Sequence, residues 1–318
     1  MQSYLHTAIV TDAVCREHRG PLEHPERPER LDAILNGLAK SDVMDLLVRS
    51  PSRAATLDEL KLCHTAAYIE LVQKEIAGGA AQLSTGDAFI CPQSWEPALR
   101  AAGCSLSAVD AVFERRAKNV FCAVRPPGHH ATADTGMGFC IFNNAAIAAR
   151  YAQKKYGAQR VAIVDWDVHH GNGTQDIFYA DGSVFYFSTH QAPLYPGTGL
   201  RDETGIGAGL GTTLNVPVAE GTTGREMSAI FREQLVPAMK IFRPDFVVVS
   251  AGFDARVNDP LGGLLLTDHD FADLTDIVLD IAKEFSEGRL ISILEGGYNL
   301  AGLASAAVQH VRTLAGHL

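Results

Sequence analysis

The stretch IVDWDVHHGNG, residues 163–173, joins the end of an apolar, β-branched run to a dense group of polar side chains. Two aspartates, two histidines and an asparagine follow the apolar residues, and two glycines close the segment. A run of this kind predicts a strand buried on both faces, as in a parallel sheet. Metal-ligand and acid–base side chains at the exit of such a strand predict a functional site at the edge of that sheet.

Apolar runs and amphipathic segments alternate on both sides of this stretch. The apolar runs lie at residues 120–124, 160–167, 184–190, 213–218, 245–254 and 290–298. Amphipathic segments that predict helices lie at residues 94–116, 143–155, 225–240, 268–286 and 300–314, with two more near 27–40 and 65–77. The alternation predicts an α/β fold, with a parallel sheet flanked by helices. Because no linker or internal repeat divides the chain, we expect one domain over residues 1–318.

The composition is that of a compact globular protein. Of 318 residues, 47% are hydrophobic and 20% are charged. The formal net charge of −10 argues against nucleic-acid binding, which needs a basic surface. No apolar run approaches the ~20 residues of a membrane span, and the first residues, MQSYLHTAIVTD, lack the features of a secretory signal. We therefore expect neither a nucleic-acid nor a membrane partner.

The six cysteines are scattered, and none belongs to a CxxC pair. This spacing argues against a cysteine-based zinc site or a dithiol redox motif. Several cysteines lie in apolar segments, such as NVFCAV and GFCIF, where a free thiol behaves as a small hydrophobic group. A reducing, cytoplasmic setting is the expectation.

Polar residues stand at the ends of four of the predicted strands. VFCAV leads into RPPGHH, VAIVDWD into VHHGNG, FVVVSAGF into Asp254, and LISILEGG into Tyr298. The carboxyl ends of parallel strands meet at one edge of a sheet, where ligands bind in open α/β folds. The four segments therefore predict one shared site.

The first predicted component of this site is a divalent metal. Asp165, Asp167 and His169 alternate in an extended segment, so their side chains point to one side. Asp254 is the candidate for a third ligand from the neighbouring strand. Three protein ligands leave a position open for water and substrate, as in catalytic zinc sites. The alternative is that the aspartates cap the next turn and His169 only packs, but the arrival of the whole set at one edge favours a metal.

The second predicted component is acid–base chemistry. His129 and His130 follow a Pro-Pro-Gly turn, and adjacent side chains point in different directions, so we expect them to have different roles. An imidazole near the metal can take a proton from water and later give it to the leaving amine. Asp165 and Asn172 are available to orient the histidines. Tyr298, after two glycines, is placed to donate a hydrogen bond to an oxyanion.

The sequence resembles the zinc-dependent histone deacetylases and their bacterial relatives. RPPGHH, GFCIFNN, DWDVHHGNGTQ, SAGFDA, DPLGG and EGGYN stand in the order found in that family, and HPERPERL is similar to its class II branch. The resemblance covers about residues 18–300. It implies a single arginase-like α/β domain with a central eight-stranded parallel sheet. It also implies removal of an acetyl or other acyl group from an acyl-lysine side chain or a related N-acyl amine.

The resemblance also implies a role for each polar residue. Zinc, with ferrous iron as an alternative, would be bound by Asp167, His169 and Asp254. His130 would be the general base and then the general acid. His129, hydrogen-bonded to Asp165, would be its electrostatic partner, and Tyr298 would polarise the substrate carbonyl. Asn172 stands where class I enzymes carry an aspartate, and a neutral partner should leave His130 less basic.

The resemblance implies a tunnel for the acyl-lysine side chain. Phe139 and Tyr195 match its aromatic walls, although the second is usually phenylalanine, and the carbonyl of Gly138 matches an acceptor for the substrate amide. Asp87 is a candidate acceptor at the rim. Leu261 stands where polyamine-specific relatives carry an acidic gatekeeper, so a leucine there favours acyl-lysine over a polycation.

A potassium site is also implied by the resemblance, at Asp165, Asp167, Ser188 and Thr189. Three alternative functions stay open beside a lysine deacylase. They are an acetylpolyamine amidohydrolase, a catalytically inactive acyl-group reader, and a binuclear manganese enzyme of the ureohydrolase type. The last would need bridging carboxylates where His170 and Asn172 stand. The sequence does not predict the oligomeric state.

Overall fold

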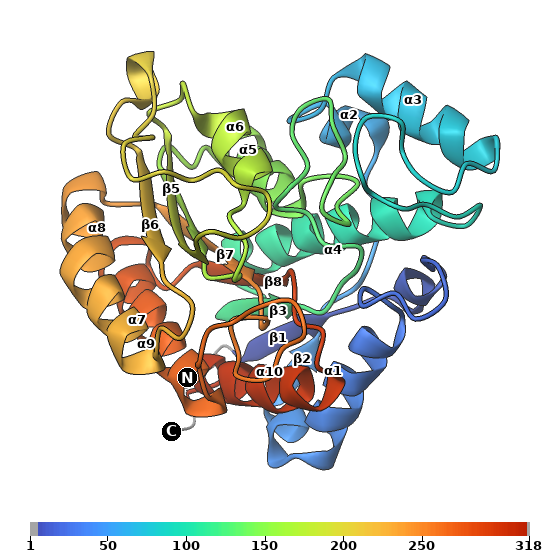
Figure 1. Cartoon of the computed structure of the whole chain (residues 1–318). Coiled ribbons are helices and arrows are strands. Elements are labelled where there is room, and N and C mark those ends of the chain that lie inside the picture. The colour runs from blue at the N-terminus through green and yellow to red at the C-terminus, as the bar shows by residue number, and fades with distance from the viewer. Residues whose placement is uncertain (1–5, 317–318) are drawn as a thin grey trace.

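The computed structural model describes residues 6–316, which contain one eight-stranded, wholly parallel sheet with helices on both faces (Figure 1). Outside the described residues lie 1–5 and 317–318. The first of these ranges begins the segment in which no secretory signal is expected. The strands are β1 Thr7–Val10, β2 Leu47–Arg49, β3 Asn119–Cys122, β4 Val161–Asp165, β5 Val184–Gln191, β6 Thr213–Val218, β7 Phe246–Ala251 and β8 Leu290–Leu294. Their order is β2-β1-β3-β8-β7-β4-β5-β6. The predicted α/β class and the eight-stranded parallel sheet are confirmed.

The apolar runs of the sequence correspond to six of the strands, β3 to β8. The sequence pattern alone missed β1 and β2. β1 is a buried run of only four residues, and the three residues of β2 at the sheet edge are half-buried or exposed. Such short strands give no distinctive periodicity. In the structure β1 pairs with β3 on one side and with β2 on the other.

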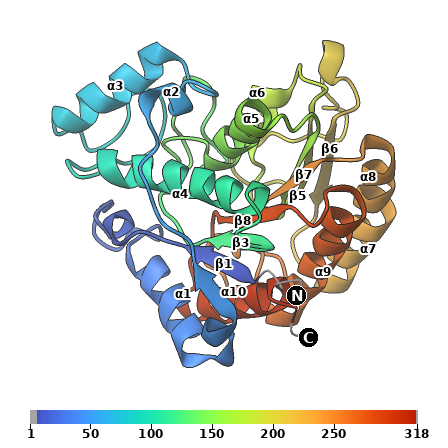
Figure 2. The same cartoon turned by 180° about the vertical axis from the view of Figure 1, so that it is seen from behind.

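The helices form two layers, one on each face of the sheet (Figure 2). They are α1 Glu29–Lys40, α2 Leu57–Leu60, α3 Ala66–Ala77, α4 Trp95–Phe113, α5 Asn144–Tyr156, α6 Asn172–Phe178, α7 Gly224–Ile230, α8 Val236–Phe242, α9 Asp268–Phe285 and α10 Leu300–Leu314. Helices α1, α9 and α10 pack together in one layer, and α4 packs on α5 in the other. The expected helix at 225–240 is α7 and α8 joined by a π-helical turn, Phe231–Leu235. Among residues 6–316, no helix is long and apolar enough to cross a membrane.

Local sequence signals account for the ends of these helices. Thr267 and Asp270 form a reciprocal capping box at the start of α9. The side chain of Asn143 accepts a hydrogen bond from the Ala146 N–H at the start of α5, and Gly157 ends that helix in a left-handed conformation. The burial of all five residues of β4 and all six of β7 then explains why these strands read as continuous apolar runs.

The register of the central strands brings the polar segments to one edge of the sheet. Asp165, the last residue of β4, pairs with Ser250 on β7 and with Ser188 on β5. β8 lies on the other side of β7 and ends at the same level, because Leu294 pairs with Ala251. The segments that follow β4, β7 and β8 therefore leave the sheet side by side.

Candidate active site

Asp167, His169 and Asp254 come together in the structure as the sequence predicts. One ligand atom of each lies within 4.8 Å of the others, and all three residues are buried. His169 Nδ1 lies 3.0 Å from Asp167 Oδ1 and 3.2 Å from Asp254 Oδ2. Two of the residues follow β4 and the third follows β7, so the register of two neighbouring strands assembles the group.

Backbone amides fix the carboxylates of this group. The Gly296 N–H donates to Asp167 Oδ2 at 2.8 Å, and the Val168 N–H donates to Asp254 Oδ1 at 2.9 Å. A β-carbon at position 296 would overlap Asp254 Oδ2 and come within 2.6 Å of Asp167 Oδ2. Only glycine permits this close approach of the β8 exit to the two carboxylates.

The donor set fits a divalent cation. Asp254 Oδ2 is buried and receives no well-directed hydrogen bond from the described residues. Burial, with the nearby Asp167 carboxylate, raises the pKa of Asp254 to about 7. Two buried carboxylates side by side are unfavourable without a compensating charge. A divalent metal would supply that charge, and Asp and His are common zinc ligands.

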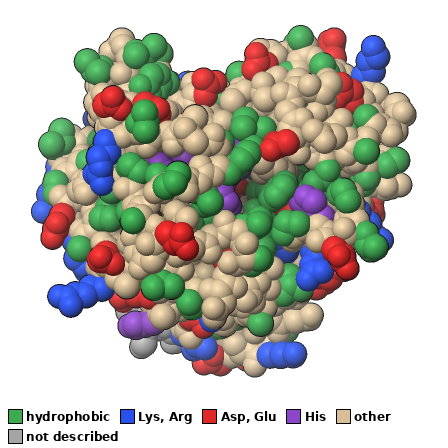
Figure 3. Space-filling view, viewed as in Figure 1, with side chains coloured by type: hydrophobic (Ala, Val, Ile, Leu, Met, Phe, Trp, Pro, Cys, Tyr) green, Lys and Arg blue, Asp and Glu red, His purple; other side chains and the backbone are tan. Residues whose placement is uncertain are grey.

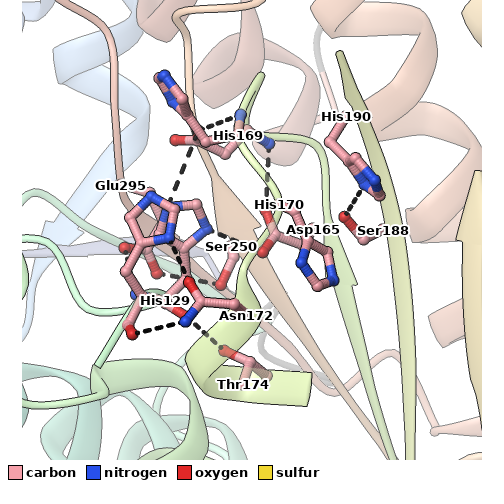
Figure 4. Close-up of polar contacts among 12 residues, drawn as sticks. His129, Asp165, His169, His170, Asn172, Thr174, Ser188, His190, Ser250 and Glu295 are labelled. Atoms are coloured by element: carbon pink, nitrogen blue, oxygen red, sulfur yellow. Dashed lines mark hydrogen bonds and ion pairs between the residues drawn. The ribbon is translucent and has the colours of Figure 1, made fainter. Parts of the chain in front are cut away.

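His129 lies in a strongly negative environment. Its Nδ1–H donates to Asp165 Oδ2 at 3.0 Å (Figure 4). The Tyr186 hydroxyl donates to the same oxygen at 3.0 Å. Its Nε2 lies 3.8 Å from Asp167 Oδ1. Burial alone would lower the pKa of His129, but the carboxylates of Asp165 and Asp167 raise it to about 10. His129 is therefore set up to carry a positive charge.

His130 has the opposite environment. Its Nδ1 lies 2.8 Å from the side-chain oxygen of Asn172, whose amide group in turn donates to the His130 carbonyl at 3.4 Å. Because an amide oxygen only accepts, Nδ1 carries the hydrogen and Nε2 keeps its lone pair. Burial, and then the nearby His129 and His169, hold the pKa of His130 well below its usual value. The structure thus gives two adjacent imidazoles with opposite protonation preferences.

Glu295 is a buried part of the site that the sequence reasoning missed. Its Oε2 accepts the Gly128 N–H at 2.7 Å and the His129 N–H at 3.1 Å, and its Oε1 accepts the Ser250 hydroxyl at 3.0 Å (Figure 4). Burial is the main cause that raises the pKa of Glu295 to about 7. The only sequence signal for Glu295 is an acidic residue directly after the apolar run of β8. The pattern EGGY predicted a role for Tyr298 alone.

A second missed group links the N-terminal HPERPERL segment to Tyr298. The Arg125 guanidinium donates to both oxygens of Glu26 at 2.7 and 2.6 Å, and Arg30 donates to Glu26 at 3.2 Å. Arg30 also donates to the Gly297 carbonyl at 2.7 Å and lies 4.9 Å from the centre of the Tyr298 ring. All three charged side chains are fully buried. No local pattern predicts such an ion-pair network, because its members are far apart in the sequence.

A cavity of about 270 Å³ leads to the metal-ligand group. It is lined by Asp87, His130, Gly138, Phe139, His169, Leu194, Tyr195, Leu261 and Tyr298. The mouth appears in Figure 3 as a hollow near the centre, with hydrophobic side chains around it and histidine visible inside. All five residues predicted to contact substrate line this cavity, and Leu194 was not predicted. Among the described residues, the Tyr298 hydroxyl makes no hydrogen bond, so it is available to a ligand.

Asp87 is partly engaged within the protein. Its Oδ1 accepts the Gly138 N–H at 2.7 Å and the Tyr195 hydroxyl at 3.1 Å. Gly138 has a φ of +54°, and a β-carbon there would overlap the His130 ring, so this turn requires glycine. The hydroxyl that distinguishes Tyr195 from the usual phenylalanine therefore ties the two walls of the mouth together.

The residues implied for potassium lie at the exits of β4 and β5. Ser188 pairs with Asp165 in the sheet, and its hydroxyl lies 2.9 Å from His190 Nδ1. The Thr189 hydroxyl is buried and has no hydrogen-bond partner among the described residues. The backbone N–H of Asp167 donates to Asp165 Oδ1 at 3.2 Å. The four residues are thus adjacent, with one unsatisfied hydroxyl among them.

His170, which had no predicted catalytic role, is not among the residues that line the cavity. Its Nδ1 lies 2.8 Å from the Thr198 hydroxyl and its Nε2 lies 3.0 Å from the Gln175 side-chain oxygen. Its ring centre is 4.7 Å from that of His190, which in turn bonds the Gly199 carbonyl at 3.0 Å. The two histidines hold the loop that follows β5, the loop that carries Tyr195.

Comparison with known proteins identifies the family. The family model described as "Histone deacetylase domain" matches residues 24–314, and the chain belongs to this family. It is 39% identical over 309 residues to the chloroplastic histone deacetylase 10 of Oryza sativa subsp. japonica, covering 92% of this chain and 70% of that protein. It is 38% identical over 299 residues to a probable deacetylase of Archaeoglobus fulgidus, covering 93% and 82%.

Two further relatives bear on fold and substrate. The polyamine deacetylase HDAC10 of Homo sapiens is 40% identical over 304 residues, covering 92% of this chain and 44% of that protein. The crystal structure of the HDA15 HD domain superimposes with a TM-score of 0.93 at 38% identity, covering 98% of this chain and 89% of that one. The chain is therefore a hydrolytic deacetylase of the arginase-like fold, in a family that is generally zinc-dependent.

Proposed function

We propose that this protein removes an acetyl or other acyl group from an acyl-lysine side chain of a protein or peptide, or from a small N-acyl amine of similar shape. One observation carries the proposal. One cavity is lined both by the rings of Phe139 and Tyr195 and by the polar side chains of His130, His169 and Tyr298. A cavity with apolar walls and polar groups at its end fits an unbranched aliphatic chain that ends in an amide.

The metal supplies Lewis-acid chemistry in this proposal. Zinc, or ferrous iron, held by Asp167, His169 and Asp254, would polarise the acyl carbonyl and lower the pKa of the attacking water. The buried Asp254 Oδ2, which receives no well-directed hydrogen bond from the described residues, supports the presence of such a cation. Potassium at Asp165, Asp167, Ser188 and Thr189 is a second cation that we propose, and the pairing of Ser188 with Asp165 across β5 and β4 supports it.

His130 moves the proton. Its Nε2 has a free lone pair, because Nδ1–H is committed to Asn172. It therefore accepts a proton from the attacking water and then delivers it to the nitrogen of the leaving amine. His129, kept cationic by Asp165, stabilises the negative charge that develops nearby.

Tyr298 and Gly138 hold the substrate amide. The free Tyr298 hydroxyl donates to the acyl oxygen as negative charge builds on it in the tetrahedral state. The Gly138 carbonyl, on the wall of the cavity, accepts a hydrogen bond from the N–H of the substrate amide. Together they orient the amide so that water attacks one face of the carbonyl while His130 protonates the amide nitrogen.

An acetylated polyamine is the second candidate substrate, because one relative is named a polyamine deacetylase. Leu261 on the cavity wall argues against it, since an apolar side chain offers nothing to a second ammonium group. A non-catalytic reader is disfavoured because all the implied catalytic residues are present. A binuclear manganese centre is disfavoured because His170 and Asn172 stand where bridging carboxylates would be needed.

Two expectations from the sequence belong to this proposal. We propose one catalytic domain over residues 1–318, supported by a sheet that joins strands from both ends of the chain. The cytoplasmic setting also stays a prediction, and the six free thiols, five of them buried, agree with a reducing compartment.

The test is a metal-dependent screen. The chain, freed of metal and reloaded with zinc or ferrous iron, is assayed on acetyl- and longer acyl-lysine peptides and on acetylated polyamines, with Tyr298→Phe beside it. We expect hydrolysis of acyl-lysine only after metal is restored, at about one metal per chain, and strong loss in the variant. A clear polyamine preference, two metals per chain, or acyl-peptide binding without hydrolysis would each support a different candidate.

A further inference from the structure

Asp259 joins the segment that carries Tyr298 to the segment that carries Leu261. Its Oδ2 accepts the N–H of Tyr298 at 2.7 Å and the N–H of Asn299 at 3.1 Å. Its Oδ1 accepts the N–H of Leu261 at 3.0 Å. The side chain is 8% exposed. The Asp259 carboxylate therefore links two loops through hydrogen bonds. One loop carries Tyr298, the proposed oxyanion donor, and lies about forty residues further along the chain. The other carries Leu261, which lines the mouth of the cavity.

The Tyr298 ring packs against Phe139 and the Arg30 guanidinium, but its hydroxyl end is held only through the backbone. No described residue accepts a hydrogen bond from its hydroxyl, so no polar contact fixes the far end of the side chain. Gly297 just before it has a φ of +117°, a conformation that glycine reaches but does not enforce. Asn299 just after it is the N-cap of α10, with its side-chain oxygen accepting the Gly302 N–H at 3.0 Å. Asp259 holds the backbone between Gly297 and Asn299 through its hydrogen bond with the Tyr298 N–H.

We propose that Asp259 is a positioning residue that acts through Tyr298, holding the phenol at the depth where it meets the acyl oxygen. The inference rests on the proposed function, because it extends the role of the same tyrosine. Hydrogen bonds from backbone N–H groups to a carboxylate are strong and directional, so the carboxylate restrains the turn in a way that packing alone does not. Preorganised donors lose most of their effect when they are displaced by about 1 Å.

The kinetic test compares two substitutions of Asp259. Asp259→Ala leaves the three N–H groups without an acceptor, and we expect kcat on an acetyl-lysine peptide to fall about 10- to 100-fold, with KM changed less than about threefold. Asp259→Asn keeps one oxygen that can accept the Tyr298 and Asn299 N–H groups, so we expect it to recover a large part of that loss. Thermal unfolding of each variant shows whether the fold is retained, and if the alanine variant does not fold, the asparagine variant carries the remaining tests.

Asp245 provides a matched control. Its Oδ2 also accepts two successive backbone N–H groups, those of Gln159 and Arg160, both at 2.9 Å. It directly precedes β7, so it lies at the amino ends of the strands, whereas the cavity lies at their carboxyl ends. Asp245→Ala therefore removes a similar set of hydrogen bonds far from Tyr298, and we expect kcat to stay within about twofold of the parent.

A double-mutant cycle separates positioning from general damage. In a Tyr298→Phe background the hydroxyl is absent, so Asp259→Ala should lower the residual kcat by less than about threefold. If Asp259 only supports the structure, the substitution will lower kcat by the same factor in both backgrounds. That additive result would overturn the proposal.

A fluorine signal tests the same point without substrate. With 3-fluorotyrosine placed at position 298 alone, we expect one sharp ¹⁹F line in the parent and in Asp245→Ala, and a shifted, broadened or split line in Asp259→Ala. An unchanged line in the Asp259 variant would refute the positioning role. If the parent hydrolyses no acyl amine at all, the proposed function fails, but the ¹⁹F line still decides whether Asp259 holds the tyrosine.

Discussion

The Nδ1 atom of His130 lies 2.8 Å from the side-chain oxygen of Asn172, so the imidazole next to the metal ligands is oriented by a neutral amide. The adjacent imidazole of His129 is instead paired with a carboxylate, that of Asp165, at 3.0 Å. The two partners support the proposal that His130 is a neutral base and His129 its cationic neighbour. This division underlies the proposed mechanism and can be changed by single substitutions.

The first prediction concerns the amide. Asn172→Asp places a negative charge on the Nδ1 side of His130, and a nearby carboxylate favours the protonated imidazole. The pKa of His130 should rise, so the acid limb of the kcat/KM profile should move to higher pH by about one unit or more, with lower activity at neutral pH. The measurement is the pH dependence of kcat/KM on an acetyl-lysine peptide. An acid limb at the same pH in both proteins would mean that His130 is not the base.

The second prediction concerns the mouth of the cavity. Leu261→Glu puts a carboxylate where a polyamine substrate would carry its second ammonium group. We expect the ratio of kcat/KM for an acetylated polyamine to that for an acetyl-lysine peptide to rise about tenfold or more, an effect that should weaken with salt. Leu261→Gln has nearly the same size without the charge and serves as the control. Equal ratios in the two variants would show that charge at this position does not select the substrate.

The third prediction concerns the close approach of β8 to the metal ligands. Gly296→Ala would push a methyl group into Asp254 Oδ2. We expect the zinc content per chain, measured by mass spectrometry after dialysis, to fall below about one tenth, because a shift of one ligand breaks the site. Gly78→Ala at the end of α3 is the control, since its added carbon meets nothing closer than 3.2 Å. Full zinc content in Gly296→Ala would contradict the proposed ligand set.

The fourth prediction concerns stability in acid, and it uses histidines away from the metal ligands. Burial lowers the pKa of His18 to about 3, of His64 to about 4 and of His310 to about 3. The unfolded chain takes up these protons near pH 6.5, while the folded chain does so only near pH 3 to 4. Stability is therefore lost as the pH falls below about 6.5, by about 1.4 kcal/mol per group and pH unit.

Urea unfolding of the metal-free protein at pH 7.5 and pH 5.5 checks this expectation. The three histidines together should contribute a loss of about 4 kcal/mol, which groups whose pKa is raised in the folded protein, such as Glu295, partly offset. His310, whose ring nitrogens contact the hydroxyls of Thr275 at 2.6 Å and Ser292 at 2.8 Å, can be tested alone. In His310→Gln the loss should be smaller than in the parent by about 1.4 kcal/mol. An equal loss in His310→Gln and in the parent would show that His310 is not buried as a neutral group.

The sequence predicted the parts of the fold and site that depend on local patterns. The buried strands β3 to β8 appeared as apolar runs, and the polar residues after them appeared as ligand and acid–base candidates. The geometry of His130 with Asn172, and of Asp167 with His169 and Asp254, agrees with those expectations. The predicted residues lie together because the end of a parallel strand fixes where the next few residues lie, and their roles stay predictions.

What the sequence did not predict depends on contacts between distant segments. The buried network of Glu26, Arg30 and Arg125 joins three segments that only the folded sheet brings together. The contacts of Glu295 and Asp259 with backbone N–H groups are also invisible in sequence, since any acidic residue near a turn could be solvated instead. The tie between Tyr195 and Asp87 is of the same kind.

The most direct test of the account is the kcat of the zinc-loaded protein on an acetyl-lysine peptide, measured beside Tyr298→Phe. The account predicts release of acetate by the parent and a fall in kcat of about 10²- to 10³-fold in the variant, because one preorganised oxyanion donor is lost while the cavity keeps its shape. The KM and the zinc content should stay close to those of the parent. A variant with full activity, or a parent that hydrolyses acetylated polyamines far better than the peptide, would contradict it.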